Sequence, residues 1–230
     1  MRTRASTFGF IVLLGILVAL LVYRSGLVSW PDGQNVLADG GFEDGTQPGG
    51  PFQPDSSGVM SIPPNRTTIP GWTVLGAPTQ DVAWGQNDNR FVFPNAARDG
   101  THFLDLTGIN DRPLPGGDFG GVAQTFSTKP RMPYQLSFDI GVMNPTFPGP
   151  ITVVAMVSSS PAENPYAQTT CGPFNPPGVG PLWTTCQLRF TAATGSTYLK
   201  IFGSSGARYI GLDRASVECV APLGRPGFCS

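Results

Sequence analysis

The stretch Tyr134-Gln135-Leu136-Ser137-Phe138-Asp139-Ile140-Gly141-Val142 decides the fold class, because every second residue in it is apolar. Such alternation is typical of a β-strand that buries one face and exposes the other. The same pattern recurs in Thr184–Phe190, Val122–Phe126 and His102–Leu106. Ile151–Val157 is more continuously apolar, which predicts a strand that is buried on both faces.

Further strands are predicted at Trp72–Leu75, Tyr198–Phe202 and Tyr209–Val217, so that the chain would hold about nine or ten short strands. Turn signals such as Pro70-Gly71 and Asp99-Gly100 separate these strands. Beyond residue 34 no helical periodicity is apparent. Many short strands with Gly/Pro turns between them predict an all-β sandwich or barrel.

Two long segments carry few strand signals and are predicted to be loops. Gly45–Thr68 is polar and rich in proline, and Glu163–Pro181 is rich in Pro, Gly and Asn. Long loops in compact domains are usually functional or disordered.

The N-terminus is predicted to be an export signal that stays attached as a membrane anchor. Ala5–Tyr23 contains 19 residues and no charge, and Arg2 and Arg4 precede it. That length suffices for a transmembrane helix, which needs roughly 17 to 25 apolar residues, and no small-x-small cleavage site follows. The positive-inside rule places the bulk of the protein outside the cytoplasm; if the segment is cleaved instead, the protein is secreted.

This gives a predicted organisation in four segments. They are a signal anchor at 1–24, a linker at 25–34, a β-sandwich at 35–220 and a disulfide-tethered tail at 221–230. Roughly two hundred residues beyond the anchor, in a chain that is 40% hydrophobic, suffice for one domain with a sizeable core.

The cysteines agree with an exported domain. An even number of cysteines beyond an export signal predicts disulfides, and the cysteines here are Cys171, Cys186, Cys219 and Cys229. Because loop closure costs least over short separations, the predicted pairs are Cys171–Cys186 and Cys219–Cys229. The alternatives are free thiols or a zinc site, but zinc usually requires Cys-x-x-Cys pairs or nearby histidine, and His102 is the only histidine.

Charge excludes one class of partner. With 14 Lys+Arg against 15 Asp+Glu, the net charge is -1 and no basic patch stands out, which argues against nucleic-acid binding. The 30 glycines and 24 prolines follow no period, so a collagen-like structure is excluded.

Six short motifs occur in order between Asn35 and Val217. They are Asn35–Glu43 (NVLADGGFE), Ile69–Trp72 (IPGW), Asp99–Leu106 (DGTHFLDL), Gly121–Phe126 (GVAQTF), Pro133–Asp139 (PYQLSFD) and Ile210–Val217 (IGLDRASV). Together they resemble the galactose-binding-like jelly rolls, in particular the exported proteins of domain-of-unknown-function family 642 and, more distantly, carbohydrate-binding modules. Asp39 stands in the usual Asn position, and the segment Gly45–Thr68 is atypical, so the resemblance does not carry a ligand specificity with it.

The resemblance implies a structural calcium ion. In the resembling modules, the Glu after the opening Phe and the Asp of the last strand often share calcium, which binds carboxylate and carbonyl oxygens. Asp213 shares strand parity with Ala215 and Val217 and is therefore predicted to point inward, where a bare carboxylate is costly. The alternative is that Asp213 caps a turn or pairs with an arginine. The candidate calcium ligands are Glu43, Asp213, Asp99 and Gly41.

The stretch from Asp81 to Asn95 is a candidate carbohydrate site. Sugars present an apolar ring face and a rim of hydroxyls, so binding sites combine aromatic rings with polar groups. Trp84, Phe91 or Phe93 could stack on a sugar, while the rim would be bound by Gln86, Asn87, Asn89 and Arg90. The alternative interpretation is that Trp84 and one Phe are core residues and that the amides form turns. Trp72 and Trp183 occur in strand-like contexts and are predicted to be core residues.

No catalytic pattern is recognisable. The chain lacks a Gly-x-Ser-x-Gly elbow, and nothing in the spacing of its carboxylates suggests the facing pair of a glycosidase. The favoured hypothesis is a non-catalytic module at the cell envelope that binds carbohydrate such as cell-wall polysaccharide. The alternatives are an envelope structural or adhesion protein with a protein partner and, less favoured, a glycan hydrolase.

Overall fold

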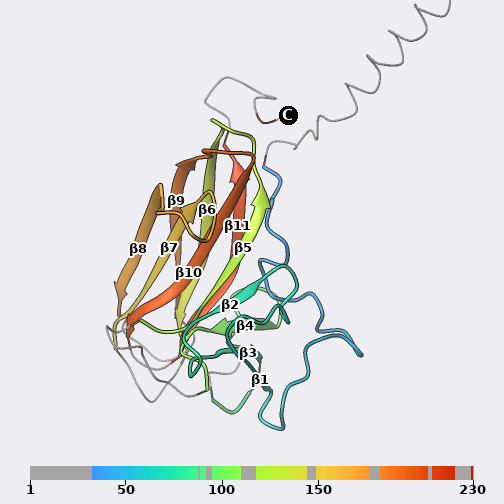
Figure 1. Ribbon diagram of the computed structural model, residues 1–230. Helices are drawn as coiled ribbons and strands as arrows, with labels where there is room; N and C mark the ends of the chain where they lie inside the picture. Colours follow the sequence, from blue (N-terminus) through green and yellow to red (C-terminus); the bar gives the residue numbers. More distant parts are fainter. Residues whose placement is uncertain are drawn as a thin grey trace, which may run out of the picture. The chain divides into compact units, whose positions relative to one another are not determined.

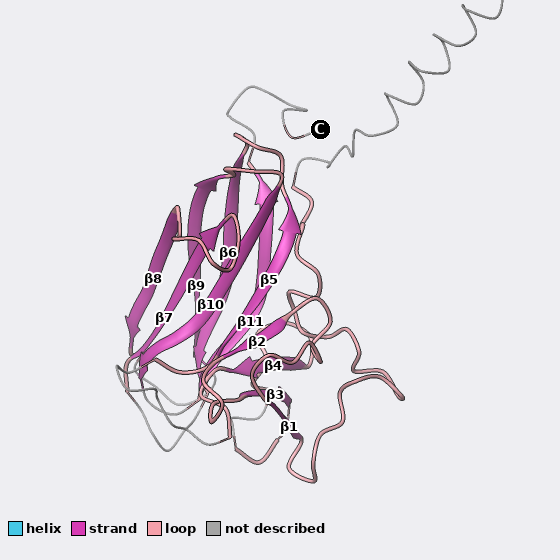
Figure 2. Cartoon of the chain, in the orientation of Figure 1, coloured by secondary structure: helices cyan, strands magenta, loops and turns pink. Residues whose placement is uncertain are grey.

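The computed structural model describes residues 33–87, 89–91, 95–109, 118–143, 149–176, 182–206, 209–220 and Cys229. The predicted anchor at 1–24, nearly all of the linker at 25–34 and all of the tail at 221–230 except Cys229 lie outside the described residues. Within the described ranges the regular structure is entirely β (Figure 2). None of the described segments is a helix of the length and hydropathy that a membrane span requires.

The described residues form an all-β sandwich of two antiparallel sheets (Figure 1). One sheet has six strands in the order β1-β3-β4-β11-β6-β9, and the other has five in the order β2-β5-β10-β7-β8. Figure 1 shows the short strands β1 to β4 gathered at one end of the long strands. The strands are β1 (Val59–Ile62), β2 (Thr73–Leu75), β3 (Val82–Gln86), β4 (His102–Asp105), β5 (Gly121–Ser127), β6 (Pro133–Val142), β7 (Ile151–Ser158), β8 (Ala167–Phe174), β9 (Leu182–Thr191), β10 (Ser196–Gly206) and β11 (Ile210–Cys219).

The core lies between the sheets and is built by strand alternation. Register places Trp84, Leu104, Leu212 and Ile140 opposite one another across β3, β4, β11 and β6, and all four side chains are fully buried. In the second sheet Val122, Ile201 and Ala155 form the equivalent buried row. Each fully buried large apolar side chain stabilises the fold by about 1.5–3 kcal/mol relative to an exposed one.

The two ends of the domain sequence meet on β11. Asn35 forms a β-bridge with Glu218, and the Val36 N–H donates to the Val217 carbonyl at 2.8 Å. The Ala215 N–H donates to the Gly40 carbonyl, also at 2.8 Å. The approach at Gly40 is so close that a Cβ there would overlap the Ala215 carbonyl oxygen, so glycine is required.

The sequence missed three strands and misjudged the exposure of a fourth. β1 lies within the predicted loop Gly45–Thr68, and β8 lies within the predicted loop Glu163–Pro181. Both are edge strands, paired on one side only, so they need less apolar sequence than a central strand. β3 lies within the stretch that we predicted as a ligand site. β7 alternates between buried and half-buried residues and is therefore not buried on both faces.

Both predicted disulfides form. Cys171 on β8 is bonded to Cys186 on β9, with 6.1 Å between the Cα atoms. Since β8 and β9 are edge strands of different sheets, this bond joins the two sheets instead of closing a surface loop. Cys219 and Cys229 are also disulfide-bonded and no cysteine is free, which leaves each as the other's partner. Two disulfides are consistent with a domain outside the cytoplasm.

Candidate functional site

The outer face of the six-stranded sheet carries an unusual row of residues. Register sets Ala83, Asp105, Gly211, Gly141 and Trp183 opposite one another across β3, β4, β11, β6 and β9. Their neighbours along each strand point into the core, so this row points away from it. The row therefore combines small residues at its centre with an aromatic ring at one end.

The indole of Trp183 lies across the two central glycines. A Cβ on Gly141 would lie 2.7 Å from the Trp183 ring, and one on Gly211 would lie 2.9 Å from it. Its Nε1–H donates to the carbonyl of Ala96 at 3.0 Å, and the half-buried ring packs against a cluster that includes Met143. Trp183, predicted to be a core residue, packs against this buried cluster, but its position in the alternation places it on the outer face and not between the sheets.

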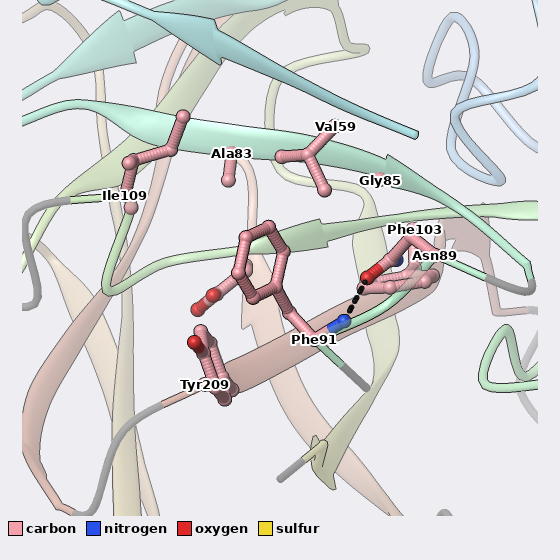
Figure 3. Close-up of a pocket in the computed structure, with 10 residues that line it drawn as sticks. Val59, Ala83, Gly85, Asn89, Phe91, Phe103, Ile109 and Tyr209 are labelled. Carbon is pink, nitrogen blue, oxygen red and sulfur yellow. Dashed lines mark hydrogen bonds between the residues drawn. The ribbon is translucent and has the colours of Figure 1, made fainter. Parts of the chain in front are cut away.

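The same face carries a pocket of about 80 Å³ over β3 and β4 (Figure 3). It is largely apolar, and the residues that line it are Val59, Ala83, Gly85, Asn89, Phe91, Phe103, Asp105, Gly108, Ile109 and Tyr209. Figure 3 shows the side chains of Phe91, Ile109, Tyr209 and Val59 gathered around it. Phe91 is 37% exposed and Ile109 is 50% exposed, although both are large and apolar. Exposed apolar side chains around a concavity are typical of a binding site.

Tyr209 at the pocket has a strained backbone. Its φ is 66°, a left-handed conformation that is uncommon for a bulky residue. Hydrogen bonds hold it there: its N–H donates to Thr107 Oγ1 at 3.0 Å, and Thr107 Oγ1 in turn donates to Asp105 Oδ1 at 2.7 Å. Such over-determined strain is commonest at functional sites.

A buried carboxylate with two arginines lies further along the same face. The Asp139 side chain is 1% exposed and accepts hydrogen bonds from Arg98 Nε at 3.1 Å and Thr185 Oγ1 at 2.5 Å. It also forms an ion pair with Arg214 Nη2 at 2.9 Å. The two arginine side chains are 45% and 48% exposed, and each guanidinium has five N–H donors. Asp139 therefore holds two partly exposed donor groups in place beside the Trp183 ring.

Asp213 is buried as predicted, but on the opposite face from the one predicted. A β-bulge between Asp213 and Ser216 shifts the register, so Asp213 pairs with Asp139 and shares its outer face rather than that of Val217. Its oxygens accept main-chain N–H bonds from Arg98 at 2.8 Å, Asp99 at 3.0 Å and Arg214 at 2.6 Å. Burial raises its pKa to about 7, against the lowering effect of these hydrogen bonds.

Glu43 holds the other end of the segment 98–102, of which Asp213 binds the first two residues. Its Oε1 accepts the main-chain N–H groups of Thr101 and His102, both at 2.6 Å, and its Oε2 lies 2.8 Å from His102 Nδ1. Burial tends to raise the pKa of Glu43, but the hydrogen bonds from His102 and Thr101 outweigh it and the pKa is lowered. Glu43 and Asp213 thus fix opposite ends of the segment 98–102.

The predicted calcium ligands do not converge into an oxygen cage. Both carboxylates already accept N–H donors, and Asp99 Oδ1 accepts the N–H of Gly100 at 3.0 Å. Gly41 lies in the turn that precedes Glu43, where Asp39 Oδ2 is buried without a hydrogen-bond partner among the described residues. No group of three or more acidic, His or Cys side chains suited to a metal occurs in the described ranges. Calcium therefore stays a prediction.

The residues predicted to bind carbohydrate divide into three groups. Trp84 is fully buried and donates from Nε1 to the Phe42 carbonyl at 3.0 Å, so it is a core residue and offers no face to a ligand. The side-chain amides of Asn89 and Asn87 are hydrogen-bonded to the main chain. Asn89 donates to the Gln86 carbonyl and accepts the Phe91 N–H, and Asn87 Oδ1 accepts the Ala97 N–H at 2.7 Å.

The third group lies at the pocket. Phe91 lines it, and the exposed Arg90 guanidinium lies 4.8 Å from the centre of the Phe91 ring. Phe93 is outside the described residues. Sequence reasoning missed Ile109, Tyr209 and Trp183. Only the outward position of Trp183 in the alternation of β9 could have revealed one of them.

No protein-family model matches the chain, so the resemblance to family 642 is not confirmed. Among solved structures, a family 61 carbohydrate-binding module in complex with β-1,4-galactotriose is 14% identical at a TM-score of 0.45, covering 82% of this chain and 100% of that chain. The K1 cleaved adhesin domain of Lys-gingipain from Porphyromonas gingivalis is 12% identical at 0.48, covering 71% and 99%. A tandem family 22 module from Paenibacillus barcinonensis is 13% identical at 0.44, covering 86% and 49%. At such low scores the function has to be inferred from the site itself.

Proposed function

We propose that this domain is a non-catalytic carbohydrate-binding module with a galactose-binding-like jelly-roll fold. The observation that carries the proposal is the outer face of the six-stranded sheet. There an apolar pocket lies over β3 and β4, the Trp183 ring lies across Gly141 and Gly211 of β6 and β11, and Asp139 holds the Arg98 and Arg214 donors on the same face. Rings for the apolar faces of sugars and fixed donors for their hydroxyls are what a glycan site needs.

The face also has room for more than one sugar. Beyond Thr185, the outward residues of β9 are the exposed Gln187 and Arg189, and they lie opposite Ser137 and Gln135 of β6. Arg189 Nε donates to Gln135 Oε1 at 3.0 Å. This polar strip runs along the strands from the aromatic end, so a linear glycan chain would lie along it.

Binding is favoured over hydrolysis by the state of the carboxylates on this face. A glycosidase needs one carboxylic acid and one carboxylate free to act on the substrate. Asp105 accepts the N–H and hydroxyl of Thr107, and Asp139 is held by Arg98, Arg214 and Thr185. Asp213, on the same face, accepts the main-chain N–H groups of Arg98, Asp99 and Arg214. All three therefore serve the structure of the site. We further propose that residues 1–24 anchor the module at the cell envelope, with the domain outside.

The glycan proposal predicts that Phe91→Ala and Trp183→Ala each weaken glycan binding by about tenfold or more, the usual effect of removing a central aromatic contact. Phe202→Ala is the matched control, because Phe202 is a half-buried ring on the outer face of the five-stranded sheet, which does not carry the proposed site. The full chain in detergent would be tested on a glycan array, followed by titration against its best glycan. Equal losses in all three variants, or binding to no glycan, would overturn the proposal; a protein partner would then be the better hypothesis.

Calcium is a second proposal for the turn held by Glu43 and Asp213. It is supported by the carboxylates of Glu43 and Asp213, which both accept hydrogen bonds from the short segment 98–102, and by Asp39 Oδ2, which is buried near Glu43 without a hydrogen-bond partner among the described residues. A ligand that binds only the folded state stabilises it by about 2.7 kcal/mol at a hundredfold excess over Kd. Added calcium should therefore raise the Tm above that in chelator, and Asp213→Ala should remove the response. An identical Tm in calcium and in chelator would show that hydrogen bonds alone hold this turn.

A further inference from the structure

The size of the outer-face pocket limits what can enter it. Its volume is about 80 Å³, about half that of the 150 Å³ apolar cavity that accepts a benzene molecule. A six-membered sugar ring with its hydroxyls is larger than benzene and does not fit. The pocket therefore takes a substituent of a few heavy atoms, while the ring that carries it stays outside.

The chemistry of the walls makes this substituent apolar. Val59, Ala83, Phe103 and Ile109 supply hydrocarbon surface. Two polar residues of the wall are committed to the chain: Asn89 donates to the Gln86 carbonyl at 2.8 Å and accepts the Phe91 N–H at 3.0 Å, and Asp105 Oδ1 accepts the N–H and hydroxyl of Thr107. Moving a hydroxyl from water into the pocket, where it finds no hydrogen-bond partner, would cost free energy.

The ring that forms one wall of the pocket carries a donor. The exposed guanidinium of Arg90 lies over the Phe91 ring, 4.8 Å from its centre, and Phe91 forms one wall of the pocket. A guanidinium has N–H donors and no acceptor, so it suits a carbonyl oxygen. An acyl group combines a carbonyl oxygen with a small apolar end, whereas a simple methyl group would leave this donor unused.

We propose that the pocket bounded by Phe91, Ile109 and Tyr209 binds the acetyl group of an acetylated glycan. This rests on the proposed function, because the rest of the glycan would lie along the outer face of the sheet. Two of the three large apolar residues that are exposed in the described ranges, Phe91 and Ile109, border this pocket. Contact with the acetyl group would explain why these apolar side chains are exposed in the domain without ligand.

The test uses pairs of glycans that differ in acetylation. Chitotetraose is compared with cellotetraose, and acetylated xylan with the same xylan after alkaline de-esterification, each titrated against the full chain in detergent. Because a pocket for one small apolar group discriminates by roughly 10–200-fold, we expect at least about tenfold tighter binding to the acetylated member of at least one pair. Equal affinities within both pairs would overturn the acetyl assignment and leave the glycan proposal standing.

Two variants locate the effect in the pocket. Ala83→Val fills it from a strand position that accepts valine, and Ile109→Ala removes an exposed wall that the fold does not need. Both should lower the acetylated-to-unacetylated affinity ratio towards one, because each weakens binding of the acetylated glycan more than binding of the unacetylated one. A preference that survives in both variants would place the acetyl group elsewhere. Failure to bind any of the four glycans or any other glycan would sink the proposed function itself.

Discussion

Replacing Trp84 with alanine is expected to lower the free energy of unfolding by about 3–5 kcal/mol, the usual cost of removing a buried aromatic side chain. Trp84 is completely buried, packs edge-on against Phe52 at 4.9 Å between ring centres, and bonds the Phe42 carbonyl. Trp183→Ala should cost less than about 2 kcal/mol, because a half-buried ring on the outer face leaves a space that water can enter. Urea unfolding followed by circular dichroism would measure both.

Substitutions of Trp84 and Trp183 should also differ in their effect on glycan affinity. Trp183→Ala should lose glycan affinity in a folded protein, whereas Trp84→Phe, which keeps a ring in the core, should retain it. Trp84→Phe should also be less destabilising than Trp84→Ala. If both alanine variants cost the same stability, or if Trp84→Phe loses affinity and Trp183→Ala keeps it, the assignment of Trp84 to the core and Trp183 to the ligand face is wrong.

Raising the pH from 4 to 8 in calcium-free buffer is expected to destabilise the domain through Asp213. A carboxyl group whose pKa is higher in the folded state contributes stability below its unfolded pKa and loses it as the pH rises through the folded value. For Asp213 these values are 3.8 and about 7. The difference corresponds to about 4 kcal/mol at most, at about 1.4 kcal/mol per pKa unit. Asp39, with a pKa raised to about 6 mainly by burial, acts in the same direction over a narrower range.

Glu43 acts in the opposite direction and only at the acid end of this range. Its pKa is lowered from 4.5, so its contribution is fully present above that pH and is lost only in stronger acid. The measurement is the free energy of unfolding by urea at several pH values, for the wild type and for Asp213→Asn. The asparagine variant should lose the Asp213 part of the pH dependence, whatever its absolute stability. Parallel curves for the two proteins would contradict the prediction.

Calcium makes the same experiment sharper. A cation bound by Asp213 would favour the ionised carboxylate, so saturating calcium should flatten the wild-type curve above pH 5 and leave that of Asp213→Asn unchanged. If calcium has no effect on either curve, the main-chain N–H groups of Arg98, Asp99 and Arg214 are sufficient partners for this carboxylate.

The all-β fold class and both disulfides could be predicted from the sequence. Central strands such as Tyr134–Val142 are predictable because one of their faces must be apolar, which produces alternation of apolar residues within the strand itself. The edge strands β1 and β8 do not, since solvent covers more of their surface and weakens the pattern. The cysteine pairing was predictable because the two short separations are also the ones that the fold brings together.

The composition of the site could be read only from the folded domain. The candidate stretch from Asp81 to Asn95 contributes Phe91 to the pocket and places Arg90 over the Phe91 ring, but its Trp84 belongs to the core. Trp183 reaches the outer face because β9 pairs with β6 in a register that sets it against Gly141. The bulge after Asp213 reversed the face that alternation predicted for that residue. The physical reason is that alternation tells which residues share a face of one strand, whereas strand order, register and bulges decide which strands place their faces together.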